Sequence, residues 1–390
     1  MFNQAHLNKF KNISTPFYYY DVEILRQTLQ QIKAESDKYG FIVHYATKAN
    51  SNSKIMNIIR EYGFGADCVS GNEIRKAVEC KFPSNHIVFA GVGKSDEEIN
   101  VALDTNIFCF NCESTQEMEV IQELAKAKGK IANIALRINP NVNANTHKYI
   151  TTGLEENKFG INLWELEKVI RTLKDLPNLN LIGLHFHIGS QITDITAFKT
   201  LCMKVNEIQS WFISHQVKIE HINVGGGWGV DYHEPDKNRF LDYAVYFKLY
   251  DDFLELRPGQ KVHFELGRAM VAQCGSLISK VLYIKKGVNT NFAILDAGMT
   301  ELMRPALYQA YHKIENISSM ANEKGQTENV KYDVVGPICE SSDCFGKAVS
   351  MAETYRGDLV ALRTAGAYGE VMSNGYNLRE KVKAIYSDEL

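Results

Sequence analysis

The sequence predicts an α/β protein: a (β/α)8 TIM barrel together with a second, antiparallel β domain. Short apolar runs alternate with amphipathic helical patterns eight times between residues 22 and 268, which is about the length of such a barrel. After residue 268, strand-like runs follow one another with little helix, as in an antiparallel domain. A length of 390 residues accommodates both domains. A doubly wound open sheet is the alternative, but the number and even spacing of the strands favour closure.

The change of pattern also gives the domain bounds. We expect residues 22–268 to form the barrel. Residues 1–21 and 269–390 are expected to form the β domain, which the β-prone run at residues 15–20 joins as an N-terminal strand.

The predicted barrel strands are short apolar runs rich in β-branched residues, typical of strands covered on both faces. They are residues 41–47, 65–70, 86–90, 107–112, 132–139, 181–187, 221–224 and 261–265. Helical patterns cover residues 22–39, 53–62, 71–80, 95–103, 114–128, 163–173, 195–214 and 240–254. Ser53, Ser95 and Ser114 are placed as helix N-caps.

The remaining segments are a long connection, a tail of strands and a polar insert. Residues 140–162 are rich in Asn, Thr and Gly, and connections of this length tend to be functional or disordered. Strands are predicted at residues 273–284, 291–296, 332–338 and 358–364, with a surface loop at residues 318–329.

The composition is that of a soluble globular protein, with 45% hydrophobic and 23% charged residues. A net charge of -3 gives no basic footprint for nucleic acid or a membrane surface. Residues 1–12 are polar and no apolar run reaches the roughly 18 residues of a membrane span, so we expect a cytoplasmic protein. The eight cysteines are then expected to be reduced thiols. Cys109 and Cys112 lie on one predicted strand and face opposite ways, which argues against a metal or redox pair.

The first barrel strand runs out at Lys48, beside small residues that leave room for a bulky group. A lysine that emerges from a buried strand is expected to be poorly hydrated. Desolvation favours the neutral amine, the form that attacks a carbonyl carbon. A lysine that reaches from the strand end into water is the alternative.

Other polar residues also fall at the ends of predicted strands, where (β/α)8 barrels build their active sites. They are Asp67, His185, His187, Ser190, Gly225 to Gly227, Glu265 and Arg268. The glycine run follows the seventh strand, where this fold often binds a phosphate through backbone N–H groups, although a tight turn is the alternative.

The charged and imidazole groups have their own alternatives. Glu265 and Arg268 could form a structural ion pair. His185 and His187 share one face of a strand, but no third metal ligand has suitable spacing, so we predict no metal site. A ring packed on a flat cofactor, or a core histidine, fits better. Lysine, phosphate cradle and carboxylate together suggest pyridoxal phosphate.

With these residues in place, the chain resembles the barrel-type (fold type III) pyridoxal-phosphate-dependent decarboxylases of ornithine, lysine, arginine and diaminopimelate. The resemblance implies an alanine racemase-like barrel. The matching segments are 44–50 (HYATKAN), 183–191 (GLHFHIGSQ), 225–227 (GGG), 265–268 (ELGR), 304–308 (RPALY), 336–342 (GPICESS) and 366–368 (GAY). They span almost the whole chain. Residues 158–161 (KFGI) resemble the branch that acts on diaminopimelate.

The resemblance implies roles for the barrel residues. Lys48 would hold the cofactor as a Schiff base, and Glu265 would bond the pyridine nitrogen. His187 would stack on the ring, and Asp67 would tune the region around the aldehyde carbon. Gly225, Gly226, Gly227 and Ser190 would hold the phosphate, with Arg268 nearby and Tyr368 reaching the phosphate from the β domain.

The resemblance also implies a homodimer with shared active sites. The second subunit would contribute Cys339, which returns a proton to the α-carbon, and Glu340, which takes a distal ammonium. Arg304 or Arg268 would bind a carboxylate, and Tyr308 would add a hydroxyl. This set implies decarboxylation of meso-2,6-diaminopimelate to L-lysine and carbon dioxide.

Two departures and two alternatives qualify this expectation. Leu266 stands where the family usually has proline, which moves no charged group, and residues 370–376 match loosely. The same fold could act on carboxynorspermidine, ornithine or arginine instead. A non-catalytic homologue would be expected to lose Lys48 or Cys339, and both are present.

Overall fold

The chain forms two compact units in the computed structural model, which describes residues 2–142, 158–319 and 328–390. One unit comprises Leu29–Gly229 and Asp242–Ala269, and the other comprises Met1–Thr28, Val230–Leu241 and Met270–Leu390. We call them the barrel unit and the β unit. The predicted division at residues 22–268 differs from this one, because it assigns residues 22–28 and 230–241 to the barrel and Ala269 to the β domain.

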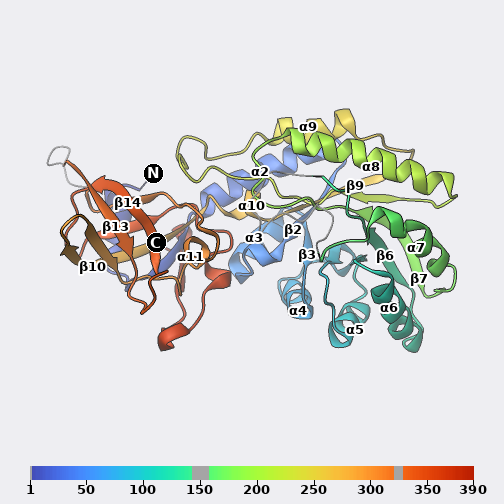
Figure 1. The fold of residues 1–390 in the computed structure, drawn as a ribbon, viewed down its shortest axis with the longest axis horizontal. Helices are drawn as coiled ribbons and strands as arrows, with labels where there is room; N and C mark the ends of the chain where they lie inside the picture. The colour runs from blue at the N-terminus through green and yellow to red at the C-terminus, as the bar shows by residue number, and fades with distance from the viewer. Residues whose placement is uncertain (1, 143–157, 320–327) are drawn as a thin grey trace. The chain divides into compact units, whose positions relative to one another are not determined.

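The barrel unit contains a closed barrel of eight parallel strands, paired in sequence order (Figure 1). The strands are β2 (Ile42–Ala46), β3 (Gly65–Cys68), β4 (Ile87–Phe89), β5 (Cys109–Cys112), β6 (Ala132–Arg137), β7 (Leu179–His185), β8 (His221–Asn223) and β9 (Lys261–Leu266). Pairing of β2 with β9, which includes His44 opposite Glu265, closes the circle. The predicted fold class and all eight predicted strands are confirmed.

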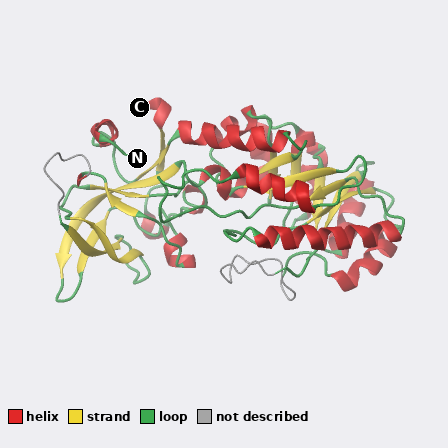
Figure 2. Ribbon diagram, turned by 90° about the horizontal axis from the view of Figure 1, so that it is seen from above, coloured by secondary structure: helices red, strands yellow, loops and turns green. Residues whose placement is uncertain are grey.

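Helices cover the outside of this barrel, and α4, α5 and α6 lie side by side on it (Figures 1 and 2). The barrel helices are α2 (Val22–Asp37), α3 (Ser53–Glu61), α4 (Gly71–Glu79), α5 (Asp96–Thr105), α6 (Thr115–Ala127), α7 (Leu166–Leu173), α8 (Thr196–Ser214) and α9 (Tyr243–Phe253). Ser95 and Ser114 cap α5 and α6 as predicted. The prediction for Ser53 is wrong, because the side chain of Asn52 accepts the first N–H bond of α3.

The β unit holds an eight-stranded, mostly antiparallel sheet. Its strands are β1 (Phe17–Tyr20), β10 (Gly275–Lys286), β11 (Asn291–Leu295), β12 (Ile314–Asn316), β13 (Asn329–Val335), β14 (Cys344–Ala352), β15 (Leu359–Leu362) and β16 (Lys383–Tyr386). The N-terminal strand β1 joins this sheet as predicted, antiparallel to β10 and parallel to β16. Its short helices are α1 (Gln4–Phe10), α10 (Arg268–Val271), which starts in the barrel unit, and α11 (Arg304–Tyr308).

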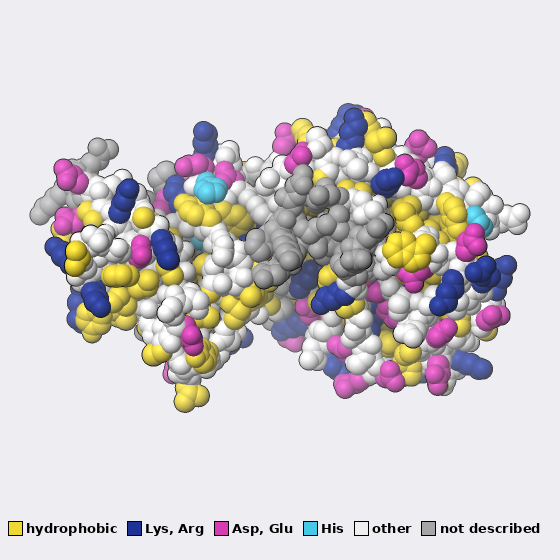
Figure 3. All heavy atoms as spheres, viewed as in Figure 1, with side chains coloured by type: hydrophobic (Ala, Val, Ile, Leu, Met, Phe, Trp, Pro, Cys, Tyr) yellow, Lys and Arg dark blue, Asp and Glu magenta, His cyan; other side chains and the backbone are white. Residues whose placement is uncertain are grey.

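Two predicted loops are described only in part. Of the connection at residues 140–162, positions 143–157 lie outside the described residues, as do positions 320–327 of the polar insert. Among the described residues, no helix has the length and apolar character to cross a membrane. On the face drawn in Figure 3, basic and acidic side chains are interspersed.

Candidate active site

Lys48 lies in a single turn, Thr47–Ala49, directly after β2. Its Nζ is 3.3 Å from Oδ2 of Asp67, which lies on β3. The Lys48 side chain is 38% exposed, so the expectation of a poorly hydrated lysine is wrong for this state of the chain. The turn carries the side chain past the end of the strand and places Nζ beside the Asp67 carboxyl group.

Asp67 is fully buried, and burial raises its pKa to about 7. The charge of Glu265 adds to this effect, while Lys48 opposes it. Oδ1 of Asp67 has no hydrogen-bond partner among the described residues. A buried acceptor without a partner beside a candidate nucleophile is expected where a bound group completes the hydrogen bonding.

Glu265, on β9, accepts hydrogen bonds from three side chains. Asn111 Nδ2 and Asn223 Nδ2 donate to Oε1 at 3.1 and 2.7 Å. His185 Nε2 lies 3.0 Å from Oε2. Burial opposes ionisation, but the electrostatic attraction and hydrogen bond of His185, with further attraction from Lys48 and His187, outweigh it, so the pKa of Glu265 is lowered. The arrangement presents an ionised, oriented carboxylate inside the barrel.

The residues of this cluster come from alternate strands. Asp67, Asn111, His185 and Glu265 lie on β3, β5, β7 and β9. Side-chain layers inside closed eight-stranded barrels are built in this way, with four side chains from every second strand. The barrel interior therefore carries a polar layer where apolar residues are usual.

The glycine turn after β8 lies against the segment that follows β7. Gly225 and Gly227 have φ values of +70° and +95°. A Cβ at Gly225 would approach Phe186 O to 2.4 Å, and one at Gly227 would approach Gly189 O to 2.2 Å. Only glycine fits such positions. The turn and residues 186–190 therefore form one tightly packed wall.

His187, Ser190 and Arg268 belong to the same wall. Arg268 Nη2 donates to Ser190 Oγ at 3.0 Å, and Arg268 is buried. Burial, with the charges of Arg137 and Lys48, lowers the pKa of His187. The imidazole is therefore neutral near pH 7.

A buried ion pair fixes the far end of the long connection. Arg137 Nη1 lies 2.5 Å from Glu113 Oε1, and Glu113 Oε2 accepts from Gly160 N at 2.8 Å. The guanidinium also lies over the ring of Phe159, 4.8 Å from its centroid. Residues 158–161 are thereby held against β6.

Five further predicted site residues lie in the β unit. Arg304 is buried and donates to His312 Nε2 at 2.8 Å. Cys339 and Glu340 are exposed, and Tyr376 Oη donates to Glu340 Oε1 at 2.6 Å. Tyr308 and Tyr368 are half-buried.

Sequence reasoning missed Asn111, Asn223 and Tyr376. For the two asparagines a signal was present, since each is an amide in a strand that was predicted to be buried in the barrel. A polar side chain in such a strand needs a buried partner. The sequence does not say which one, because Asn111 and Glu265 are 154 residues apart.

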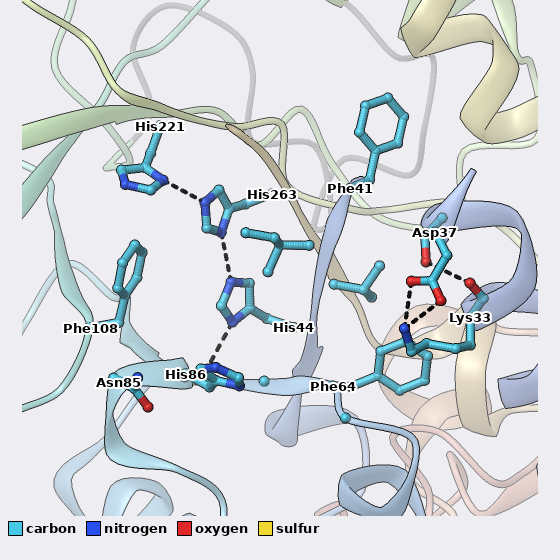
Figure 4. A pocket seen from close by; sticks show the side chains of 15 residues that line it. Lys33, Asp37, Phe41, His44, Phe64, Asn85, His86, Phe108, His221 and His263 are labelled. Atoms are coloured by element: carbon cyan, nitrogen blue, oxygen red, sulfur yellow. Dashed lines mark hydrogen bonds and ion pairs between the residues drawn. The ribbon is translucent and has the colours of Figure 1, made fainter. Parts of the chain in front are cut away.

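A separate pocket of about 400 Å³ lies at the amino ends of the barrel strands, away from the predicted site residues (Figure 4). Three imidazoles on its wall form a hydrogen-bonded relay. Because the carbonyl oxygen of His86 only accepts, His44 Nδ1 donates to it. With neutral rings, His263 then donates to His44, and His221 to His263, at 2.9 and 2.8 Å.

The residues of the barrel unit fit pyridoxal phosphate. Lys48 offers an amine for its aldehyde and Glu265 an ionised acceptor for its ring nitrogen. The glycine turn offers backbone N–H groups, and Arg268 a positive charge, for its phosphate.

Comparisons with known proteins agree with this chemistry. Residues 23–272 match the family described as "Pyridoxal-dependent decarboxylase, pyridoxal binding domain". The diaminopimelate decarboxylase of Bacteroides thetaiotaomicron is 59% identical over 385 residues, which cover 98% of each chain. That of Helicobacter pylori strain J99 is 40% identical over 382 residues, covering 98% of this chain and 92% of the relative.

Solved structures give the same result. The crystal structure of Helicobacter pylori diaminopimelate decarboxylase complexed with L-lysine has a TM-score of 0.91 at 37% identity. The match covers 99% of this chain and 94% of that chain. The family match spans well over half of the sequence and the curated relatives nearly all of it, so the chain belongs to the pyridoxal-dependent decarboxylases, carboxy-lyases that use pyridoxal 5'-phosphate.

Proposed function

We propose that this chain decarboxylates meso-2,6-diaminopimelate to L-lysine and carbon dioxide, the last step of lysine biosynthesis. The observation that carries the proposal is the 59% identity, over 98% of both chains, to a diaminopimelate decarboxylase. The polar layer of the barrel supports it, because it supplies the ionised carboxylate of Glu265 and sets Asp67 beside Lys48.

Pyridoxal phosphate, when bound, would supply an aldehyde that combines with amines and a ring that accepts the electron pair left on the α-carbon when carbon dioxide departs. Lys48 would hold the aldehyde carbon. The Glu265 carboxylate would accept a hydrogen bond from the protonated ring nitrogen. The three side chains that donate to Glu265 favour its ionised form, which this role needs. Neutral His187 would pack on the ring face, and Asp67 would share a proton with the groups around Lys48.

The phosphate would bind at Gly225 to Gly227 and Ser190. Arg268 already donates to Ser190 and would add positive charge there. Tyr368 would donate its hydroxyl to the same phosphate.

The β-unit residues would complete the site in a homodimer. Cys339 Sγ would deliver a proton to the α-carbon that loses its carboxyl group, and its exposure in the isolated chain supports this role. Glu340 would take the distal ammonium of the substrate. Arg304 or Arg268 would take the carboxylate that is retained, with Tyr308 adding a hydroxyl. A diamine-forming enzyme would not need this second carboxylate site.

We also place the protein in the cytoplasm. All eight cysteines are free thiols, including the exposed Cys339, which fits a reducing compartment.

The test is a substrate panel on the purified chain loaded with pyridoxal phosphate. Carbon dioxide release and lysine formation should be observed with meso-diaminopimelate, and not with ornithine, arginine or carboxynorspermidine at equal concentration. Lys48→Ala is the matched control and should abolish turnover. Turnover of any other panel member, with diaminopimelate inert, would overturn the assignment of substrate.

A further inference from the structure

We propose that Asn223 is a positioning residue that ties the Glu265 carboxylate to the glycine turn at Gly225, so that the ring and phosphate ends of the cofactor are bound in register. The inference rests on the proposed function only in requiring that pyridoxal phosphate binds at this site.

The side-chain amide of Asn223 makes one hydrogen bond through its nitrogen and one through its oxygen. Nδ2 donates to Glu265 Oε1 at 2.7 Å, and Oδ1 accepts from Gly225 N at 2.9 Å. An amide nitrogen only donates and an amide oxygen only accepts, so the reverse orientation would set oxygen against oxygen and N–H against N–H. Asn223 is 5% exposed, which leaves little water to replace either bond.

The backbone reinforces this link. Glu265 N donates to Gly225 O at 2.7 Å. A Cβ at Gly226 would lie 1.9 Å from Glu265 O, so turn and strand are in direct contact. The group expected to meet the ring nitrogen and the backbone expected to meet the phosphate therefore move as one unit, with Asn223 as the side-chain tie.

Asn111 provides a matched comparison, because it donates to the same carboxylate oxygen from a different direction. It lies on β5, four strands from β9 around the closed barrel and so on the opposite side. Lys94 Nζ donates to the backbone carbonyl oxygen of Asn111 at 2.9 Å. Replacing Asn111 removes a donor from Glu265 without removing the acceptor for Gly225 N.

The experiment compares two probes, pyridoxal phosphate and pyridoxal, which differ only in the phosphate. Dissociation constants are measured by absorbance titration, and their ratio gives the gain in affinity due to phosphate. Asn223→Ala should lower this ratio by about tenfold or more, the loss expected for a buried hydrogen bond near a charge. Asn111→Ala should weaken the binding of both probes and leave the ratio of their dissociation constants within about threefold of the parent's ratio. Asn180→Ala, which removes an exposed amide on β7, should change neither dissociation constant.

Asn223→Asp gives a second, pH-dependent readout. A protonated aspartic acid reproduces the donor and acceptor of asparagine, whereas two ionised carboxylates this close repel, so one proton is shared between them. The variant should behave like the parent at pH 6 and like Asn223→Ala at pH 9. This outcome also covers the case in which Asn223→Ala fails to fold.

The results separate the two levels of the proposal. If the parent binds pyridoxal phosphate but Asn223→Ala and Asn111→Ala keep the same affinity ratio, or Asn223→Asp shows no pH transition beyond the parent's, the inference is overturned and the proposed function stands. If the folded parent binds neither probe, the proposed function fails and the inference with it.

Discussion

Replacing His44 by phenylalanine should destabilise the barrel unit at pH 8 and progressively less as the pH falls. In the imidazole relay of Figure 4, His44 is the end ring, which is bonded to His263 on one side and to the His86 carbonyl oxygen on the other. Phenylalanine has a similar size but loses the hydrogen bonds to His86 O and His263. At pH 8 this should cost about 1–3 kcal/mol.

The pH dependence follows from the pKa of His44, which burial lowers from 6.5 to about 4 against the opposing charge of Glu265. Below pH 6.5 the unfolded chain binds a proton at this histidine and the folded chain does not. The parent therefore loses stability as the pH falls from 6.5 towards 4, by about 1.4 kcal/mol per pH unit and about 3 kcal/mol in all. His44→Phe cannot lose this stability, so its deficit should shrink and then reverse.

Urea unfolding followed by tryptophan fluorescence measures this in the barrel unit, because Trp164, Trp211 and Trp228 all lie there. His86→Phe is the control, since the relay uses the backbone carbonyl of His86 and not its exposed ring. A constant difference between parent and His44→Phe from pH 8 to pH 4.5 would refute the relay as described.

Three further predictions concern the candidate site. Asp67→Asn should abolish most activity. Burial raises the pKa of Asp67, so as the pH rises from 4 to 7 the unfolded parent releases a proton that the folded parent keeps, and the parent loses stability. Asp67→Asn should lose less stability over this range, which urea titrations at several pH values measure. Arg137→Ala should cost about 3–5 kcal/mol by leaving Glu113 buried and unpaired, whereas Arg137→Met combined with Glu113→Gln should cost much less. Mixing Lys48→Ala with Cys339→Ala chains should restore part of the activity if each site draws residues from two subunits, and no recovery despite demonstrated subunit exchange would contradict the shared site.

The barrel was predictable from sequence because its strands are short, apolar and separated by capped helices. In the β unit, β14 (Cys344–Ala352) was missed, since Gly346 and exposed Lys347 interrupt any alternating pattern. The three-residue strand β12 is too short to give a pattern. These strands form through pairing with distant neighbours, which local sequence does not report.

The site was predictable where one residue type at a strand end carries its own chemistry, as with Lys48, Glu265 and the glycine turn. Asn111 and Asn223 were missed because their role depends on the Glu265 carboxylate, which Asn111 reaches across the closed barrel and Asn223 reaches from the neighbouring strand. The exposure of Lys48 was misjudged for a related reason. The turn after β2, not the strand, sets how far its side chain extends.

The central claim is that Lys48 is the residue that binds the aldehyde of pyridoxal phosphate. Borohydride reduction of the loaded protein, followed by digestion and mass spectrometry of the peptides, tests it directly. We predict one modified peptide, carrying the reduced cofactor on Lys48, and none in Lys48→Ala. An unmodified Lys48 peptide, or label on another lysine at equal yield in the variant, would contradict the account.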